Sequence, residues 1–396
     1  MNMKIRINEH FGSIKESYLF SDIAKRVKAY TEAHPDQKII RLGIGDVTLP
    51  LTPAVISAMH RATDEMANAA TFRGYAPTES GYDFLRNGIA DYYGRMGVRL
   101  KGSEIHVNDG AKSDIGNLVD ILGDNEILIP DPVYPVYVDS NLMSGRKITY
   151  LEANEANGFL PMPQGVEEKP YVIYLCSPNN PTGAVYSSAQ LTEWVNFALR
   201  TGSLILFDSA YESYIRGDFP HSVYAVEGAK ACAVEICSLS KTAGFTGTRC
   251  GWTVMPDELE ADGTKLAKLW VRRQATKFNG VPYVIQRAAE AAVSVQGHAE
   301  ALECVNYYME NARILSDFQR EKNIWFTGGE NSPYLWLRCP NGMGSWEFFD
   351  HLLQNAQVVG TPGEGFGKCG EGYFRLTSFG TRESTVEAVE RLKKLL

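Results

Sequence analysis

Features that mark several common protein classes are missing from this chain of 396 residues. No apolar run reaches the ~18 residues needed to cross a bilayer, and the first eight residues lack the apolar core of a signal peptide. No block of basic residues occurs, and 47 acidic against 39 basic residues give a net charge of −8. We therefore expect neither a membrane nor a nucleic acid as a partner.

Patterned cysteines and histidines are also missing. The seven cysteines include no Cys-x-x-Cys pair, and the seven histidines show no spacing of the His-Glu-x-x-His kind. Scattered cysteines in a protein of this size are typical of reduced thiols, so we expect a cytoplasmic protein. The histidine pattern predicts no metal site. Low-complexity linkers and internal repeats do not occur either.

The middle of the chain alternates short apolar runs with helical patterns, which is typical of an α/β fold. The runs are β-branched and nearly continuous in hydrophobicity, as expected for strands buried on both faces of a mainly parallel sheet. The expected strands are Ile39–Gly43, Glu104–Val107, Glu126–Ile129, Tyr171–Cys176, Leu204–Phe207, Val234–Cys237 and Gly251–Val254. The expected helices include Pro53–Ala69, Tyr82–Met96, Lys112–Leu122 and Ala189–Leu199.

The pattern changes near Val281 to that of a smaller α+β domain. Long helices are expected at Pro282–Val295 and Glu300–Lys322, strands at Tyr334–Cys339 and Tyr373–Ser378, and a last helix at Thr381–Leu396. Because the length suits two domains, we expect a large domain over residues 39–281 and a small domain over residues 282–396. Residues 1–38 are expected to form an N-terminal arm and part of the small domain.

A group of chemically suited residues surrounds Lys241, in Ser238-Leu-Ser-Lys241. A lysine amine can bond the aldehyde of pyridoxal phosphate, and Arg249 with the hydroxyls of Ser238 and Ser240 can hold a phosphate. A single lysine is ordinarily a solvated surface residue, and Arg249 alone could belong to an ordinary ion pair. The coincidence of all these groups in one order favours the cofactor.

An acid and a tyrosine follow the preceding strand. Asp208 closes the apolar run Leu204–Phe207, and Tyr211 comes three residues later. A buried aspartate can keep the pyridine nitrogen of the cofactor protonated, which makes the ring an electron sink. The tyrosine can donate a hydrogen bond to the phenolic oxygen of that ring. Taken alone, Asp208 could equally be a strand end or a helix cap.

Other strand ends carry further candidates, since ligands of such sheets gather at the carboxyl ends of strands. Gly110, Ala111 and Lys112 open a helix whose N–H groups can seat a phosphate, although an ordinary N-cap would look the same. Tyr134 can stack on a flat cofactor or serve as a core residue. Asn180, in a turn fixed by prolines, directs an amide toward the same edge.

Arg375 lies in the apolar run Tyr373-Phe-Arg-Leu-Thr377. An arginine among apolar neighbours needs a carboxylate partner, because an unpaired buried charge is costly. That partner is either a protein carboxylate or the carboxylate of a substrate held by the guanidinium fork. The glycine-rich segment from Gly360 to Gly367 has no P-loop lysine, so we interpret it as a turn.

In this order, these residues resemble the fold-type I pyridoxal phosphate enzymes, and among them the aminotransferases. The closest resemblance is to the LL-diaminopimelate aminotransferase family. It is carried by Leu42-Gly-Ile-Gly-Asp46, Phe72-Arg-Gly-Tyr-Ala-Pro77, Asp109-Gly-Ala-Lys112, Asp131-Pro-Val-Tyr-Pro-Val-Tyr-Val-Asp139, Thr276-Lys-Phe-Asn-Gly280 and Tyr373-Phe-Arg-Leu-Thr377. The resemblance implies a large domain with a seven-stranded sheet, a smaller domain, and a homodimer with shared active sites.

The resemblance also implies roles for individual residues. Lys241 carries pyridoxal phosphate; Gly110, Ala111, Ser238, Ser240 and Arg249 hold its phosphate; Tyr134 stacks on the ring; Asn180 and Tyr211 bond the phenolic oxygen; and Asp208 faces the ring nitrogen. The α-carboxylate of the substrate meets Gly45, Asn180 and Arg375. The far end of the substrate is served by Tyr18, Lys112 and Asn279, while Tyr75 reaches the active site of the neighbouring subunit.

One stretch departs from the family pattern. The family places a glutamate between a proline and a Gln-Gly pair, whereas here the run after Tyr75 is Ala76-Pro-Thr-Glu79-Ser-Gly81, one residue longer. We assign Glu79 as the equivalent, facing the distal amine. Lys112 adds a cation next to the phosphate seat, which suits a dicarboxylic substrate, although it could assist only the phosphate.

The implied reaction passes an amino group from L-glutamate to L-tetrahydrodipicolinate in a ping-pong cycle, giving LL-2,6-diaminopimelate, a precursor of lysine and peptidoglycan, and 2-oxoglutarate. Three alternatives stay open. One is an aminotransferase of the same fold for aspartate, aromatic or kynurenine-type substrates. The second is a sensor that binds the cofactor without turnover, although no DNA-binding segment is visible. The third is a lyase or decarboxylase, which shares Lys241 and Asp208 but has less need of Arg375.

Overall fold

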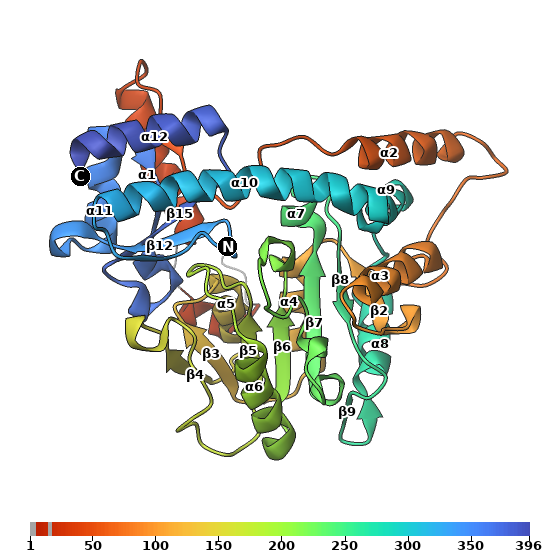
Figure 1. Cartoon of the computed structure of the whole chain (residues 1–396). Coiled ribbons are helices and arrows are strands. Elements are labelled where there is room, and N and C mark those ends of the chain that lie inside the picture. Colours follow the sequence, from red (N-terminus) through yellow and green to blue (C-terminus); the bar gives the residue numbers. More distant parts are fainter. Residues whose placement is uncertain (1–4, 15–17) are drawn as a thin grey trace.

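A seven-stranded sheet forms the centre of the structure, a computed structural model that describes residues 5–14 and 18–396 (Figure 1). Its strands are β2 (Ile105–Asn108), β3 (Ile127–Asp131), β4 (Ile148–Glu152), β5 (Val172–Cys176), β6 (Leu204–Asp208), β7 (Ala233–Ser238) and β8 (Gly251–Val254), in the order β2-β8-β7-β6-β5-β3-β4. Neighbours pair in parallel except where β8 meets β2 and β7. The predicted mainly parallel sheet is confirmed.

Both faces of this sheet are covered, as the continuous apolar runs predicted. Alternate residues of β5 point to opposite cores: Ile173 packs in the same cluster as Trp194, and Tyr174 in the same cluster as Trp270. The helices that follow and surround the strands are α2 (Pro53–Met66), α3 (Asp83–Arg95), α4 (Ala111–Asn117), α5 (Pro135–Met143), α6 (Ser188–Thr201), α7 (Leu239–Thr242), α8 (Leu266–Lys277) and α9 (Tyr283–Val293).

One expected strand lies elsewhere. Within the run Ile39–Gly43, the short strand β1 (Ile40–Arg41) pairs with β13 (Val358–Val359), outside the large sheet. The seventh strand of the large sheet is β4, at its edge. No residue of β4 is buried, and Tyr150 is 46% exposed, so this strand has no continuous apolar run to reveal it.

A second core lies beyond the sheet, around strands β11 (Phe326–Gly328), β12 (Tyr334–Arg338), β15 (Tyr373–Thr377) and β14 (Thr361–Pro362). Helices α1 (Leu19–Ala33), α11 (Ser345–Ala356) and α12 (Arg382–Leu395) pack on it. The long helix α10 (Val295–Glu321) links the two regions, since Ala301 belongs to the first core and Leu315 to the second (Figure 1). The domain boundaries expected from the sequence stay a prediction.

The remaining strands, β9 (Glu260–Ala261) and β10 (Thr264–Lys265), form a small hairpin before α8. Across the two described ranges, no helix combines the length and the apolar character needed to cross a membrane. The expected helix Lys112–Leu122 is shorter than predicted: α4 ends at Asn117, and a 3-10 turn over Leu118–Ile121 follows.

Candidate active site

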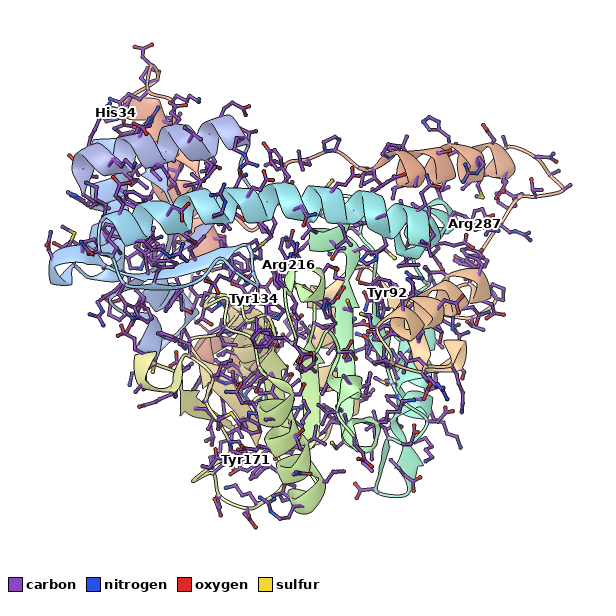
Figure 2. All side chains as sticks on the ribbon, viewed as in Figure 1. His34, Tyr92, Tyr134, Tyr171, Arg216 and Arg287 are labelled. Atoms are coloured by element: carbon purple, nitrogen blue, oxygen red, sulfur yellow. The ribbon has the colours of Figure 1, made fainter. Side chains whose placement is uncertain are left out.

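The carboxyl ends of the central strands lie at one level, and most of the predicted residues follow them. In the sheet register, Cys176 of β5 pairs with Asp208 of β6, and Ser238 of β7 pairs with Gly251 of β8. The arrows of β6 and β7 point toward α10 (Figure 1). Tyr134 lies at this edge of the sheet, and Tyr171, which precedes β5, lies at the other end (Figure 2).

A seat for an anion forms where β2 and β7 end. The Ser238 hydroxyl donates to Oγ of Ser240 at 2.9 Å, and Nη1 of Arg249 donates to the same Oγ at 3.3 Å. Gly110, with φ +117, caps the start of α4, and a Cβ there would overlap Nη2 of Arg249. The missing side chain therefore lets the guanidinium lie against the helix start, where Ala111 begins α4.

Asn108 holds this seat in place, although its sequence pattern did not predict a role for it. Its Oδ1 accepts the N–H of Gly110 at 2.9 Å, while its Nδ2 donates to Oδ2 of Asp114 at 2.7 Å. The Thr253 hydroxyl donates to the same carboxylate oxygen at 2.6 Å. Burial raises the pKa of Asp114 to about 6. A polar residue at the end of a buried strand was the one available signal.

Asp208 is buried and doubly hydrogen-bonded. Its Oδ2 accepts the hydroxyl proton of Tyr137 at 2.6 Å, and its Oδ1 accepts the N–H of Ala210 at 3.0 Å. Burial raises the pKa of this carboxyl, and the two hydrogen bonds oppose the shift. Tyr137 had no predicted role, although it lies in the run Asp131–Asp139 that carries the resemblance.

Lys241 lies in the short helix α7, which Ser238 caps. Its Nζ donates to the carbonyl oxygen of Gly45, so the loop that follows β1 reaches the lysine. Burial, together with the positive charges of Arg375 and Arg249 but against the charge of Asp46, lowers the pKa of the amine from 10.5 to about 8. A neutral amine is a nucleophile, and this environment increases its share near neutral pH.

Arg375 is only 1% exposed, and no carboxylate of the described residues pairs with it. Nη1 donates to Oδ1 of Asn180 and Nη2 to the carbonyl oxygen of Gly43, each at 2.6 Å, while Nε has no partner. The rings of Tyr334 and Phe366 lie 4.5 and 4.8 Å from the guanidinium carbon. Of the two interpretations of this arginine, the geometry favours a carboxylate supplied from outside.

The glycine-rich segment after Gly360 is more than a turn, because its Phe366 touches Arg375. Phe366, Tyr18 and Lys112 line one cavity of about 1900 Å³ beside α5. Nζ of Lys112 lies 5.3 Å from the ring centre of Tyr18 and 5.9 Å from that of Tyr134. The structure therefore brings the side chains of Tyr18, Lys112 and Tyr134 together. Burial, reinforced by Arg249, lowers the pKa of Lys112.

Three predicted residues do not bond the central residues of the site, Lys241 and Arg375, within one chain. Tyr75 is 85% exposed, Asn279 is exposed and Glu79 is half-buried. In the part of the chain that the structure describes, none of them makes a hydrogen bond or ion pair with Lys241 or Arg375. Next to Glu79, Ser80 is buried and shares a 2.8 Å hydrogen bond with Nδ1 of His106, so this loop is anchored on β2.

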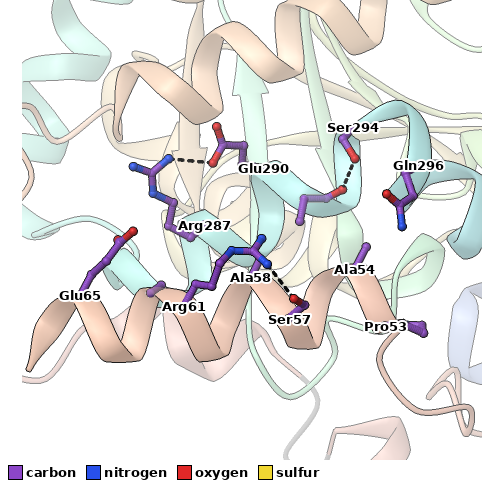
Figure 3. A pocket seen from close by; sticks show the side chains of 12 residues that line it. Pro53, Ala54, Ser57, Ala58, Arg61, Glu65, Arg287, Glu290, Ser294 and Gln296 are labelled. Carbon is purple, nitrogen blue, oxygen red and sulfur yellow. Dashed lines mark hydrogen bonds and ion pairs between the residues drawn. The ribbon is translucent and has the colours of Figure 1, made fainter.

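A second cavity, of about 720 Å³, lies between α2 and α9 (Figure 3). Two of its polar pairs lie within the lining itself. Nη1 of Arg287 lies 2.9 Å from Oε2 of Glu290, and Nη1 of Arg61 donates to Oγ of Ser57 at 2.6 Å. None of the predicted site residues lines this cavity. The candidate active site is therefore the region around Lys241, at the carboxyl ends of the central strands.

Comparison with known proteins shows the family of this chain. Residues 37–392 match the family described as aminotransferase class I and II. The chain therefore belongs to the class I and II aminotransferases, and it is an enzyme of that class.

Within this class, similar proteins share one name. The chain is 53% identical to an LL-diaminopimelate aminotransferase of Agathobacter rectalis, over 98% of this chain and all of the relative. It is 52% identical to the enzyme of the same name in Bacteroides fragilis, over 98% of this chain and 99% of the relative. The solved structure of L,L-diaminopimelate aminotransferase from Chlamydomonas reinhardtii matches with a TM-score of 0.93 and 39% identity, over 100% of this chain and 99% of that chain. The predicted resemblance and fold class are confirmed.

Proposed function

We propose that the protein is a pyridoxal phosphate-dependent LL-diaminopimelate aminotransferase. It passes the amino group of L-glutamate to L-tetrahydrodipicolinate, which water opens to its keto form, and yields LL-2,6-diaminopimelate and 2-oxoglutarate. The observation that carries this proposal is Arg375, a buried guanidinium with no carboxylate partner among residues 5–14 and 18–396, which bonds Asn180 on the same side of the large sheet as Lys241. The name shared by relatives of 51 to 53% identity supports the choice of substrate.

The residues at the sheet edge fit pyridoxal phosphate. Arg249, the hydroxyls of Ser238 and Ser240, and the start of α4 suit its phosphate. Asp208, buried behind this edge, suits the ring nitrogen, and the amine of Lys241 suits the aldehyde. When bound, the cofactor supplies an electron sink for the negative charge that develops at the α-carbon of the amino acid.

The chain's own residues then orient the substrate and move a proton. Arg375 and Asn180 hold the α-carboxylate through charge-assisted hydrogen bonds. The lowered pKa of Lys241 makes part of its amine neutral near pH 8. This amine removes the proton from the α-carbon of the amino donor and, in the second half of the cycle, gives a proton to the α-carbon of the product. Tyr211, which is 7% exposed at the carboxyl ends of the strands, would donate a hydrogen bond to the phenolic oxygen of the bound cofactor, and Asp208 would supply a negative charge to its ring nitrogen.

The far end of the substrate is bound by residues of two chains. Tyr18 and Lys112, which line the large cavity, take the distal carboxylate. Tyr75, Asn279 and Glu79 complete the site in a homodimer, since none of the three makes a hydrogen bond or an ion pair with Lys241 or Arg375 of its own chain. The 85% exposure of the Tyr75 ring is what a residue that contributes to a second chain requires. We place this homodimer in the cytoplasm.

A coupled assay tests the proposal. Purified enzyme is given LL-diaminopimelate and 2-oxoglutarate, and tetrahydrodipicolinate formation is followed; parallel reactions contain meso-diaminopimelate, aspartate, an aromatic amino acid and kynurenine. We expect turnover with the LL isomer at the highest kcat/KM of the panel. A higher kcat/KM with aspartate, an aromatic amino acid or kynurenine would assign the protein to a different aminotransferase of this fold.

A further inference from the structure

Tyr334 connects two residues that have separate tasks in the proposed reaction. Its hydroxyl shares a hydrogen bond with the hydroxyl of Tyr211. The guanidinium carbon of Arg375 lies 4.5 Å from the centre of the Tyr334 ring. Tyr211 faces the cofactor and Arg375 faces the carboxylate of the substrate. One side chain, from a third segment of the chain, therefore touches both.

The fold fixes the position of this side chain. Tyr334 begins β12, where its Cα pairs with Thr377 of β15, and it is 1% exposed. Its ring meets the Tyr211 ring edge-on at a centroid distance of 5.1 Å. On the other side lies Gly45, where a Cβ would come within 2.7 Å of the Tyr334 hydroxyl oxygen. The hydroxyl fits because this position is glycine.

The hydroxyl pair has a defined direction once Tyr211 is used. A phenol has one proton and can accept hydrogen bonds with its lone pairs. If Tyr211 donates its proton to the phenolic oxygen of the cofactor, the bond between the two tyrosines must run from Tyr334 to Tyr211. A donor on the oxygen of Tyr211 strengthens the hydrogen bond that Tyr211 itself donates, because hydrogen bonds in a chain polarise one another.

We propose that Tyr334 is a positioning residue with two separable parts, a hydroxyl that directs the proton of Tyr211 toward the cofactor and a ring that holds the guanidinium of Arg375. This inference rests on the proposed function and deepens it. The hydroxyl acts on the protonation of the cofactor, and the ring acts on binding of the carboxylate. The two parts can be removed one at a time.

The first variant, Tyr334→Phe, removes only the hydroxyl. The phenolic oxygen of the bound cofactor loses part of a stabilising hydrogen bond, so the pH midpoint of the cofactor's absorbance change should rise by ~0.5–1 unit. The KM for glutamate should stay within about twofold of the wild-type value, since the ring remains below Arg375. Tyr334→Leu removes the ring as well and should raise that KM by roughly tenfold.

Tyr224→Phe is the matched control, because this buried hydroxyl donates to the carbonyls of Ala233 and Val254, where β7 begins and β8 ends, away from the site. Its midpoint and KM should equal those of the wild type. In a Tyr211→Phe background, adding Tyr334→Phe should not shift the midpoint further, because the Tyr211 hydroxyl through which Tyr334 acts is already absent. If Tyr334→Phe is poorly folded by circular dichroism, the midpoint is measured in Tyr334→Leu, which is smaller and also lacks the hydroxyl.

Two outcomes would overturn the inference: a midpoint in the folded hydroxyl-free variant equal to that of the wild type, or an additive shift in the double variant. A wild-type protein that shows no cofactor absorbance after incubation with pyridoxal phosphate would instead contradict the proposed function. Cofactor affinity, measured by equilibrium dialysis of apoprotein, separates the two failures without any turnover.

Discussion

Tyr137 donates a hydrogen bond of 2.6 Å to Oδ2 of Asp208, and this bond is buried at the end of β6. The ring of Tyr137 is held by stacking on Tyr174, with a centroid distance of 5.2 Å. Burial alone would favour the protonated, neutral form of Asp208, and the hydrogen bond opposes that tendency. The tyrosine therefore helps to keep the negative charge on which the proposed chemistry depends.

Removing this hydroxyl should change the pH dependence of catalysis. In Tyr137→Phe the carboxylate loses a donor, so the pKa of Asp208 rises and the group takes up its proton at a higher pH. The acidic limb of the kcat profile should move upward by ~0.5–1 pH unit. Tyr174→Phe is the control, since that hydroxyl accepts a hydrogen bond from Nδ2 of Asn141 and makes none with Asp208. Identical acidic limbs in the two variants would show that Tyr137 does not support Asp208.

Arg375→Lys should weaken substrate binding through the carboxylate. A lysine keeps the charge but cannot reproduce the guanidinium fork that bonds Asn180 and Gly43. We expect the KM for glutamate and for 2-oxoglutarate to rise by at least about tenfold, since a charge-assisted hydrogen bond contributes ~1.5–3 kcal/mol. Arg338→Lys, at an exposed ion pair with Glu155, should leave both values unchanged. Unaltered KM values in Arg375→Lys would remove this arginine from the substrate site.

The lowered pKa of Lys241 predicts how apoprotein takes up its cofactor. The neutral amine is the reactive form, and its share grows as the pH rises through about 8, compared with the ordinary 10.5. The rate constant for pyridoxal phosphate binding, followed by stopped-flow absorbance between pH 6 and 10, should therefore increase with pH and level off above about 9. A rate constant that continues to increase toward pH 10 would show that burial does not lower the pKa of Lys241.

Lys112→Gln separates two roles for the cation above Tyr18 and Tyr134. If it binds the distal carboxylate, the KM for LL-diaminopimelate and glutamate should rise about fivefold to tenfold, while the KM for a monocarboxylic amino acid should not change. The dissociation constant of pyridoxal phosphate should stay near the wild-type value. A loss of cofactor affinity with unchanged KM ratios would instead assign Lys112 to the phosphate.

The sequence predicted the parts of the fold that depend on local pattern. The strands that end at Cys176, Asp208 and Ser238 are buried on both faces, and such runs are recognisable because nearly every residue is apolar. The edge strand β4 was missed because it lacks that property. The pairing of β1 with β13 joins residues more than 300 positions apart, and no local pattern encodes such a partner.

The residues of the candidate site also fall into two groups, those that the sequence predicted and those that it did not. Lys241, Asp208, Asn180 and Arg375 could be named because each is a reactive or charged residue in a distinctive setting. Tyr137, Asn108 and Tyr334 could not, since their importance lies in contacts across the fold that resemble ordinary core packing in the sequence. The role proposed for Tyr75 comes from the resemblance alone, because it requires a second chain, and it stays a prediction.

The most direct test of the central claim is chemical. Enzyme loaded with pyridoxal phosphate is reduced with borohydride, digested and mapped by mass spectrometry, with Lys241→Ala treated in parallel as a correctly folded but inactive control. We predict a single pyridoxyl-modified peptide that contains Lys241, and no such peptide in the variant. A label on another side chain, or no label on any lysine, would contradict the account.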